Sequence, residues 1–279
     1  MVNINTFIGC KDDYEKAKIV MFGAPYDGTS SYRPGSRFAP ADIRAESYGI
    51  ETYSPYLDRD LSDIDVFDSG DLELCFGNPK KVLEDIYTCT KNLVADKKIP
   101  FMIGGEHLIT LGAVKALSFT YPNLHVIHFD AHADLRDDYL GEKLSHATVM
   151  RRCYDILGGN RIFQFGIRSG DREEFTFAKY HINQQKFNFN GIEKLKSIIK
   201  SNPVYFTLDL DVLDSSILPG TGTPEAGGAS FPELMTAIYE VFKLNVVGFD
   251  IVELSPRQDP SGASTSLACK LIREILLQF

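Results

Sequence analysis

The sequence predicts an α/β fold, a single domain with a mostly parallel central sheet that is flanked by helices on both faces. Short apolar runs of the kind that form buried strands alternate with longer stretches whose apolar residues follow the helical period. Strands that are apolar throughout are typical of a parallel sheet covered on both faces. No internal repeat and no linker rich in Pro, Gly or Ser divides the chain, so one domain over residues 1–279 is expected.

Six apolar, β-favouring runs are the expected strands. In chain order they are Ile19–Phe22, Pro100–Ile103, Leu124–Phe129, Arg161–Phe165, Val204–Leu210 and Val246–Val252. Their lengths and compositions suit strands buried in the middle of a sheet.

Three stretches place their apolar residues along one helical stripe and are the expected helices. They cover Pro79–Asp96, Pro232–Leu244 and Ser264–Leu277. In the first of them Val82, Ile86 and Leu93 recur at helical spacing. Pro79 and Pro232 suit a first helical turn, where the N–H that proline lacks has no partner to lose.

Composition and charge exclude several classes of protein. The formal charge is −9, which argues against a nucleic-acid binder and leaves room for a cationic small-molecule substrate. No stretch has the length and hydropathy of a membrane span or of a signal peptide. The five cysteines are scattered and form no CxxC pair, so reduced thiols and a cytoplasmic location are expected.

Polar side chains follow five of the expected strands, at the edge where an open parallel sheet binds its ligands. The stretch HFDAHADLRDD, which begins at His128, places Asp130, His132 and Asp134 at every second position. Because residues two apart in a strand point the same way, these side chains should converge. Buried carboxylates are costly unless they are paired or bind a metal ion.

Two other strand ends add side chains of the same kind, Asp209 and Asp211 after one strand and His107 after a Gly-Gly turn. The six candidate metal ligands are His107, Asp130, His132, Asp134, Asp209 and Asp211. Two divalent cations would neutralise the four carboxylates. A set of oxygen and imidazole ligands without thiolate disfavours structural zinc and suits Mn²⁺, two ions per chain, although nickel, cobalt or zinc would also fit.

Five motifs in order resemble the ureohydrolase family, which includes the arginases and agmatinases. They are GAPYDGTSSYRPGSRFAPADIR from Gly23, GGEH, DAHAD, LDLDVLD followed by PGTGTPEAGG, and FDIVE. The similarity runs from about residue 17 to the C-terminus and is greatest to bacterial agmatinases. It implies an arginase-like three-layer sandwich, a ureohydrolase activity and a homo-oligomer, a trimer or hexamer.

The resemblance also implies a role for each candidate residue. His107 and Asp134 match ligands of the first manganese ion, His132 and Asp211 match ligands of the second, and Asp130 and Asp209 match the bridging positions. Glu253 falls where the family holds the substrate guanidinium, and His146 where a histidine passes protons. A water shared by the two metals would supply hydroxide near neutral pH. Attack on the guanidinium carbon, oriented by Glu253, would then give urea and a free amine, protonated through His146.

Three residues depart from the family pattern or stand outside it. Glu106 replaces the Asp that is common in GGDH, and Ala147 follows His146 where Gly is frequent. Neither is a ligand position, so the geometry of the centre should survive. His128 shares strand parity with Asp130 but lies deeper, and we expect a satisfied core histidine or a support of the ligands rather than a third ligand.

The interval from Leu135 to Ser145 is similar to that of bacterial agmatinases and has Arg136 where an arginase usually has Asn. Agmatine, cleaved to putrescine and urea, is therefore the expected substrate, with guanidinobutyrate and arginine as alternatives. A distal ammonium group could meet one of three carboxylates by charge complementarity. These are Asp171, Glu173 and Glu174. A catalytically silent metal-binding regulatory homologue and a single-zinc deacetylase-type hydrolase are the hypotheses from other classes.

Overall fold

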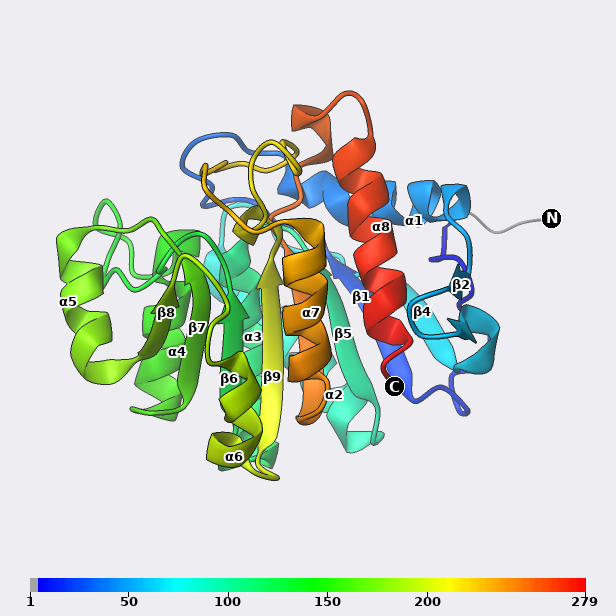
Figure 1. Ribbon diagram of the computed structural model, residues 1–279, viewed down its shortest axis with the longest axis horizontal. Coiled ribbons are helices and arrows are strands. Elements are labelled where there is room, and N and C mark those ends of the chain that lie inside the picture. The colour runs from blue at the N-terminus through cyan, green and yellow to red at the C-terminus, as the bar shows by residue number, and fades with distance from the viewer. Residues whose placement is uncertain (1–4) are drawn as a thin grey trace.

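In the computed structural model, which describes residues 5–279, eight parallel strands form the central sheet in the order β4-β1-β5-β10-β9-β6-β7-β8 (Figure 1). The strands are β1 (Ile19–Ala24), β4 (Val66–Asp71), β5 (Ile99–Gly104), β6 (His125–Phe129), β7 (Ile162–Ile167), β8 (Asn183–Lys186), β9 (Pro203–Asp209) and β10 (Asn245–Val252). A separate antiparallel pair joins β2 (Tyr53–Ser54) to β3 (Arg59–Asp60).

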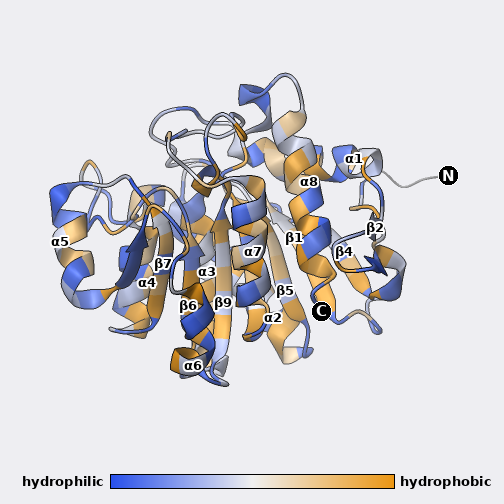
Figure 2. Cartoon of the chain, viewed as in Figure 1, coloured by the Kyte–Doolittle hydropathy of each residue, from blue (hydrophilic) through white to orange (hydrophobic). Residues whose placement is uncertain are grey.

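The six predicted strands are confirmed as β1, β5, β6, β7, β9 and β10. The apolar pattern missed the short β2–β3 pair and two strands of the central sheet, β4 and β8, which are its edge strands. The β8 sequence NQQK is polar and is coloured hydrophilic in Figure 2, in contrast to the central strands. An edge strand pairs on one side only and has less need of apolar side chains, so its sequence carries a weaker signal.

Helices cover both faces of the sheet, which confirms the predicted fold class. One face carries α1 (Ala39–Glu46), α6 (Leu195–Ile199), α7 (Phe231–Val241) and α8 (Ala263–Leu276), and the other carries α2 (Pro79–Ala95), α3 (Thr110–Thr120), α4 (Val149–Leu157) and α5 (Arg172–His181). Each face has its own apolar cluster, and Figure 1 shows α7 and α8 in front of the strands with α2 and α3 behind. The boundary 1–279 stays a prediction, because residues 1–4 lie outside the described part of the chain.

Two of the predicted helix starts are confirmed by their caps. Asn78 accepts a hydrogen bond from the backbone N–H of Lys81 and so caps α2, whose first residue is Pro79. Ser230 and Glu233 form a reciprocal capping box at α7, with a proline in its first turn. Such caps satisfy N–H groups that have no partner within the helix.

The topology brings the carboxyl ends of β5, β10, β9 and β6, neighbours in the sheet, to one edge. Loops that follow these strands therefore lie side by side although they are far apart in the sequence. In residues 5–279, none of the helices has the length and apolar character needed to cross a membrane.

Candidate active site

The six predicted ligands come from three neighbouring strand ends. His107 opens a short 3-10 turn after β5, the stretch from Asp130 to Asp134 follows β6, and Asp209 and Asp211 lie at the end of β9. The two aspartates are joined by a hydrogen bond from the backbone N–H of Asp211 to the Asp209 carboxylate, 2.9 Å long. The structure brings all six side chains together in two groups that share one residue.

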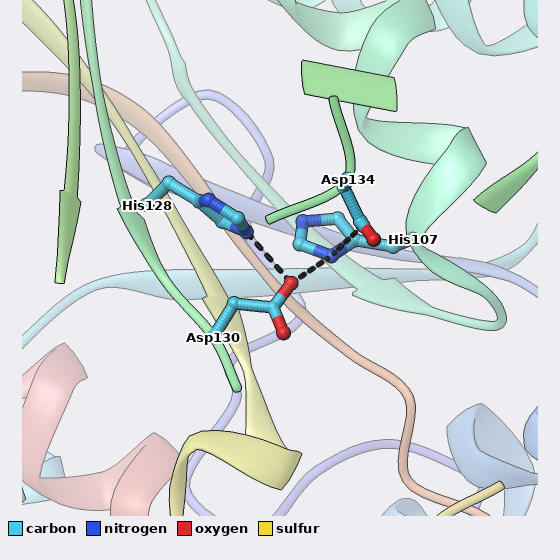
Figure 3. Close-up of side chains that lie close together, drawn as sticks. All are labelled: His107, His128, Asp130 and Asp134. Carbon is cyan, nitrogen blue, oxygen red and sulfur yellow. Dashed lines mark hydrogen bonds and ion pairs between the residues drawn. The ribbon is translucent and has the colours of Figure 1, made fainter. Parts of the chain in front are cut away.

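The first group surrounds Nδ1 of His107. Carboxylate oxygens of Asp130, Asp209 and Asp134 lie 3.1, 3.2 and 3.4 Å from this nitrogen. The nitrogen is buried, and none of these contacts has hydrogen-bond geometry. Figure 3 shows His107 and Asp134 on one side of the Asp130 carboxylate.

The second group surrounds Nδ1 of His132, which lies 2.9 Å from Asp211 Oδ2 and 3.5 Å from Asp130 Oδ1. Asp130 thus belongs to both groups, with Oδ2 towards His107 and Oδ1 towards His132. The ligand atoms of His107, Asp130 and Asp134, together with His128, lie close enough to one another to hold one cation, and those of Asp130, His132 and Asp211 close enough to hold a second. The arrangement is the one expected of a carboxylate that bridges two ions.

The electrostatics of the centre favour bound cations. Asp130, Asp134, Asp209 and Asp211 are all buried. Burial, and then the charge of Asp130, raise the pKa of Asp134 well above its usual range. Burial, and then the charge of Asp211, raise the pKa of Asp209 in the same way. Four buried carboxylates in contact must therefore share protons or bind cations, and the donor set fits two divalent ions.

A hydrogen bond below the centre sets the orientation of His107. Its Nε2 lies 2.9 Å from the hydroxyl of Thr207, which also contacts the hydroxyl of Thr110 and the carboxylate of Asp250. With Nε2–H donating to Thr207, the lone pair of Nδ1 faces three carboxylate oxygens. That contact is unfavourable unless a proton or a metal ion lies between them.

Glu253 follows β10 and lines the same cavity as His132 and Asp134. Its Oε1 accepts the backbone N–H of His107 at 2.7 Å, which fixes the carboxylate beside the first group. Burial, reinforced by the carboxylate of Glu106, raises the pKa of Glu253 to about 8. A cationic substrate would favour its ionised form.

His146 also lines the cavity, at the start of a 3-10 turn before α4. Its Nε2 lies 3.2 Å from Ser31 Oγ and its Nδ1 lies 3.3 Å from Ser145 Oγ. Burial lowers the pKa of His146 to about 4, so the ring is neutral at pH 7.

The cavity has a volume of about 250 Å³ and a charged outer wall. Arg136 Nη1 lies 2.8 Å from Asp171 Oδ2, and Arg136 Nε lies 3.5 Å from Glu174 Oε2. Of the three carboxylates considered for a distal ammonium, Asp171 and Glu174 line this cavity, whereas Glu173 is exposed and lines another.

Sequence reasoning missed several residues that hold the site in place. Glu106 is buried and accepts hydrogen bonds from the backbone N–H and the hydroxyl of Thr29, and Thr29 Oγ1 accepts the backbone N–H of His146. Thr207 could have been found, because it stands two residues before Asp209 and so shares its strand parity. The contact between Thr29 and His146 spans 117 positions, and no local pattern predicts it.

Comparison with known proteins gives a consistent result. Residues 17–278 match the model of the arginase family. The chain is 46% identical to the agmatinase of Bacillus subtilis (strain 168), over 98% of this chain and 96% of that protein. It is 38% identical to the N(1)-aminopropylagmatine ureohydrolase of Thermococcus kodakarensis, over 90% of this chain and 88% of the other.

A solved structure shares the whole fold. The agmatine ureohydrolase of Thermoplasma volcanium superposes with a TM-score of 0.90 at 36% identity, covering 100% of this chain and 95% of that one. The similarity therefore extends over both faces of the sheet and all of the loops that carry the candidate site.

Proposed function

This chain belongs to the arginase family and is a ureohydrolase of the agmatinase type, and on that premise we propose that it hydrolyses agmatine to putrescine and urea with two bound Mn²⁺ ions. The observation that carries the proposal is the division of the ligands into two groups joined by the two oxygens of Asp130. His107 and Asp134 would hold one ion and His132 and Asp211 the other, with Asp130 and Asp209 between them. When bound, such a pair of cations supplies the nucleophile by lowering the pKa of water.

Glu253 is the residue that would hold the guanidinium group. Its carboxylate offers two oxygens to a planar, fork-shaped cation, the pairing that gives strong and directional hydrogen bonds. The backbone N–H of His107 already fixes this carboxylate, so little orientation is lost when substrate binds. The guanidinium carbon would thereby be presented to the side of the cavity where the metal ligands lie.

His146 would pass the proton that the leaving amine requires. The ring is neutral at pH 7 and has a serine hydroxyl near each nitrogen. A neutral imidazole can give up the proton on one nitrogen while it accepts another on the second. We therefore propose that His146 relays protons between Ser31 and Ser145 rather than standing as an imidazolium.

The names of the relatives and the cavity wall support a substrate with a cationic tail. Two similar proteins act on agmatine or on an agmatine that carries an added aminopropyl group. In this chain Asp171 and Glu174 supply negative charge at the outer wall. Arg136 lies between them and favours a second candidate, a guanidino acid such as guanidinobutyrate, whose carboxylate it could bind.

Amide substitutions distinguish the two candidates. If the tail is an ammonium group, Asp171→Asn and Glu174→Gln should each raise KM for agmatine several-fold and change kcat little, because the lost contact is remote from the reacting carbon. Asn at position 171 can still cap α5, so folding is preserved. The matched control is Glu173→Gln, which should change neither constant. A fall in KM for guanidinobutyrate with KM for agmatine unchanged would instead favour the acidic substrate, because Arg136 would lose a competing carboxylate.

The assembly and the location of the protein are also proposals. The trimeric or hexameric assembly is proposed from the family resemblance. The cytoplasmic location is proposed from the scattered cysteines, all five of which are free. Gel filtration with light scattering would measure the assembly directly.

A further inference from the structure

Beneath the metal ligands a row of polar side chains crosses the sheet. Gln184 on β8 pairs in register with Gln164 on β7, Gln164 pairs with His128 on β6, and His128 pairs with Thr207 on β9. Thr207 in turn pairs with Asp250 on β10. All but Gln184 are fully buried. A buried row of this kind is costly unless each group is bonded.

The hydrogen bonds of this row fix the orientation of Gln164. Its Nε2 lies 2.7 Å from the carbonyl oxygen of Ala133, which can only accept, so the amide NH₂ faces that side. Its Oε1 accepts a hydrogen bond from Nε2 of Gln184 at 2.9 Å. The second N–H of Gln164 therefore donates to Nδ1 of His128, 3.0 Å away.

This bond determines which nitrogen of His128 carries the proton. Because Nδ1 accepts from Gln164, the ring proton lies on Nε2, which is 2.7 Å from Asp130 Oδ2. Figure 3 shows the His128 ring directed at the Asp130 carboxylate. His128 is close enough to be counted among the possible cation ligands, but both of its nitrogens are already engaged.

We infer that His128 is a positioning residue: it donates Nε2–H to the shared carboxylate Asp130, and the Gln184–Gln164 pair holds it in that tautomer. The inference rests on the proposed metal site. A donor to one oxygen fixes the rotation of the carboxylate, so that the remaining lone pairs face the two cation positions. Hydrogen-bond partners of metal ligands typically contribute about 10–100-fold to metal affinity or activity.

Two substitutions of His128 separate a donor from a ligand. In His128→Gln an amide N–H takes the place of Nε2–H, whereas His128→Phe keeps a ring and removes the donor. We expect His128→Gln to bind two Mn²⁺ per chain with affinity within a few-fold of the wild type. His128→Phe should bind them about 10–100-fold more weakly. Manganese titration by calorimetry measures the affinity, and the spin-coupled Mn²⁺ signal in electron paramagnetic resonance reports the pair of ions. The control is Gln185→Leu, on β8 next to Gln184.

The outcomes are distinct. If His128→Gln loses a metal ion as fully as His128→Phe, His128 is a ligand and the inference is wrong. If His128→Phe binds manganese as the wild type does, the donor is unimportant and the inference is also wrong. If the wild type itself fails to bind two ions, the proposed metal site fails before the inference is reached.

A measurement on the wild-type protein avoids any problem with the folding of variants. Two-bond ¹H–¹⁵N spectra of histidine-labelled protein report the tautomer of each ring. We expect His128 to be the Nε2–H tautomer without metal and to stay so after zinc, a diamagnetic probe, is added. A move of the proton to Nδ1 on loading would show that Nε2 binds the ion, and would contradict the inference.

Discussion

Two carboxylates of the candidate site stand on residues with a left-handed backbone. Asp134 has φ 53° and Glu253 has φ 65°, a region of backbone conformation that residues other than glycine rarely adopt. Such a conformation costs about 1–3 kcal/mol and persists where the surrounding structure enforces it. At Glu253 the surroundings include a hydrogen bond from its N–H to the carbonyl of Gly105 and one from His107 to its carboxylate. The backbone strain therefore lies at two residues, Asp134 and Glu253, that line the cavity.

The proposed relay role of His146 gives a test at the scale of one residue. His146→Asn should lower kcat by about 10²–10⁴-fold, the usual contribution of a proton-transfer group. Binding of two metal ions and KM should change little, because His146 contacts neither group of ligands. Steady-state kinetics with metal analysis measures this, and Tyr139→Phe, on the same cavity wall, is the matched control. An unchanged kcat would remove His146 from the chemistry.

At this scale the sequence predicted the types of ligand but not their contacts. Asp130, His132 and Asp134 stand at every second position after β6, and Asp209 and Asp211 do so at the end of β9. Residues two apart in a strand point the same way, so this spacing was enough to predict that each set converges. The left-handed turns at Asp134 and Glu253 depend on distant hydrogen bonds, and the low pKa of His146 depends on burial by other loops. Neither has a local signature.

Among the secondary-structure elements, two loops are linked by Arg168, which follows β7. Its guanidinium donates to the carbonyls of Asp211 at 2.7 Å and Glu225 at 2.8 Å, so it ties the turn after β9 to the loop over residues 219–228. We expect Arg168→Met to lower the free energy of unfolding by about 2–3 kcal/mol, since hydrogen bonds to a charged group are lost. It should also weaken metal binding through Asp211.

Urea unfolding of the metal-free protein measures the first effect, and a manganese titration measures the second. Arg172→Met, an exposed arginine on α5, is the control and should change neither. If both variants match the wild type, the loops are held by other contacts.

Asp259, in the loop before α8, provides a pH-dependent test. Its carboxylate accepts hydrogen bonds from the hydroxyl and backbone N–H groups of Ser261 and Ser264. The hydrogen bonds from Ser261, and then those from Ser264, lower the pKa of Asp259 to about 2. Because the pKa is lower in the folded state, the carboxylate stabilises the fold above the unfolded value of 3.8, and this is lost as pH falls towards 2.

Asp259→Asn should therefore be less stable than the wild type at pH 5 by about 1–2 kcal/mol, and the difference should narrow at pH 3. Unfolding by urea at both pH values tests this, with exposed Asp12→Asn as the control. A difference that is constant between pH 5 and pH 3 would show that the charge of Asp259 does not contribute.

For the whole molecule, the active site follows from the order of the strands. The predicted runs supplied the six inner strands, because buried parallel strands are apolar throughout. Their order across the sheet, with β10 between β5 and β9, could not be predicted from any of them alone. That order places Glu253, after β10, between the loop of His107 and the end of β9. Glu253 can therefore accept the backbone N–H of His107 and line one cavity with Asp209.

The most direct test of the account is urea release by the manganese-loaded protein, assayed in parallel with agmatine, arginine, guanidinobutyrate and guanidinopropionate. We expect agmatine to be hydrolysed and the other three to be poor substrates. Removal of the metal by a chelator, and Asp211→Ala, should abolish the activity. Hydrolysis of another guanidino compound in preference to agmatine would contradict the assigned substrate. Failure to release urea from any of them, with two manganese ions bound, would contradict the proposed reaction itself.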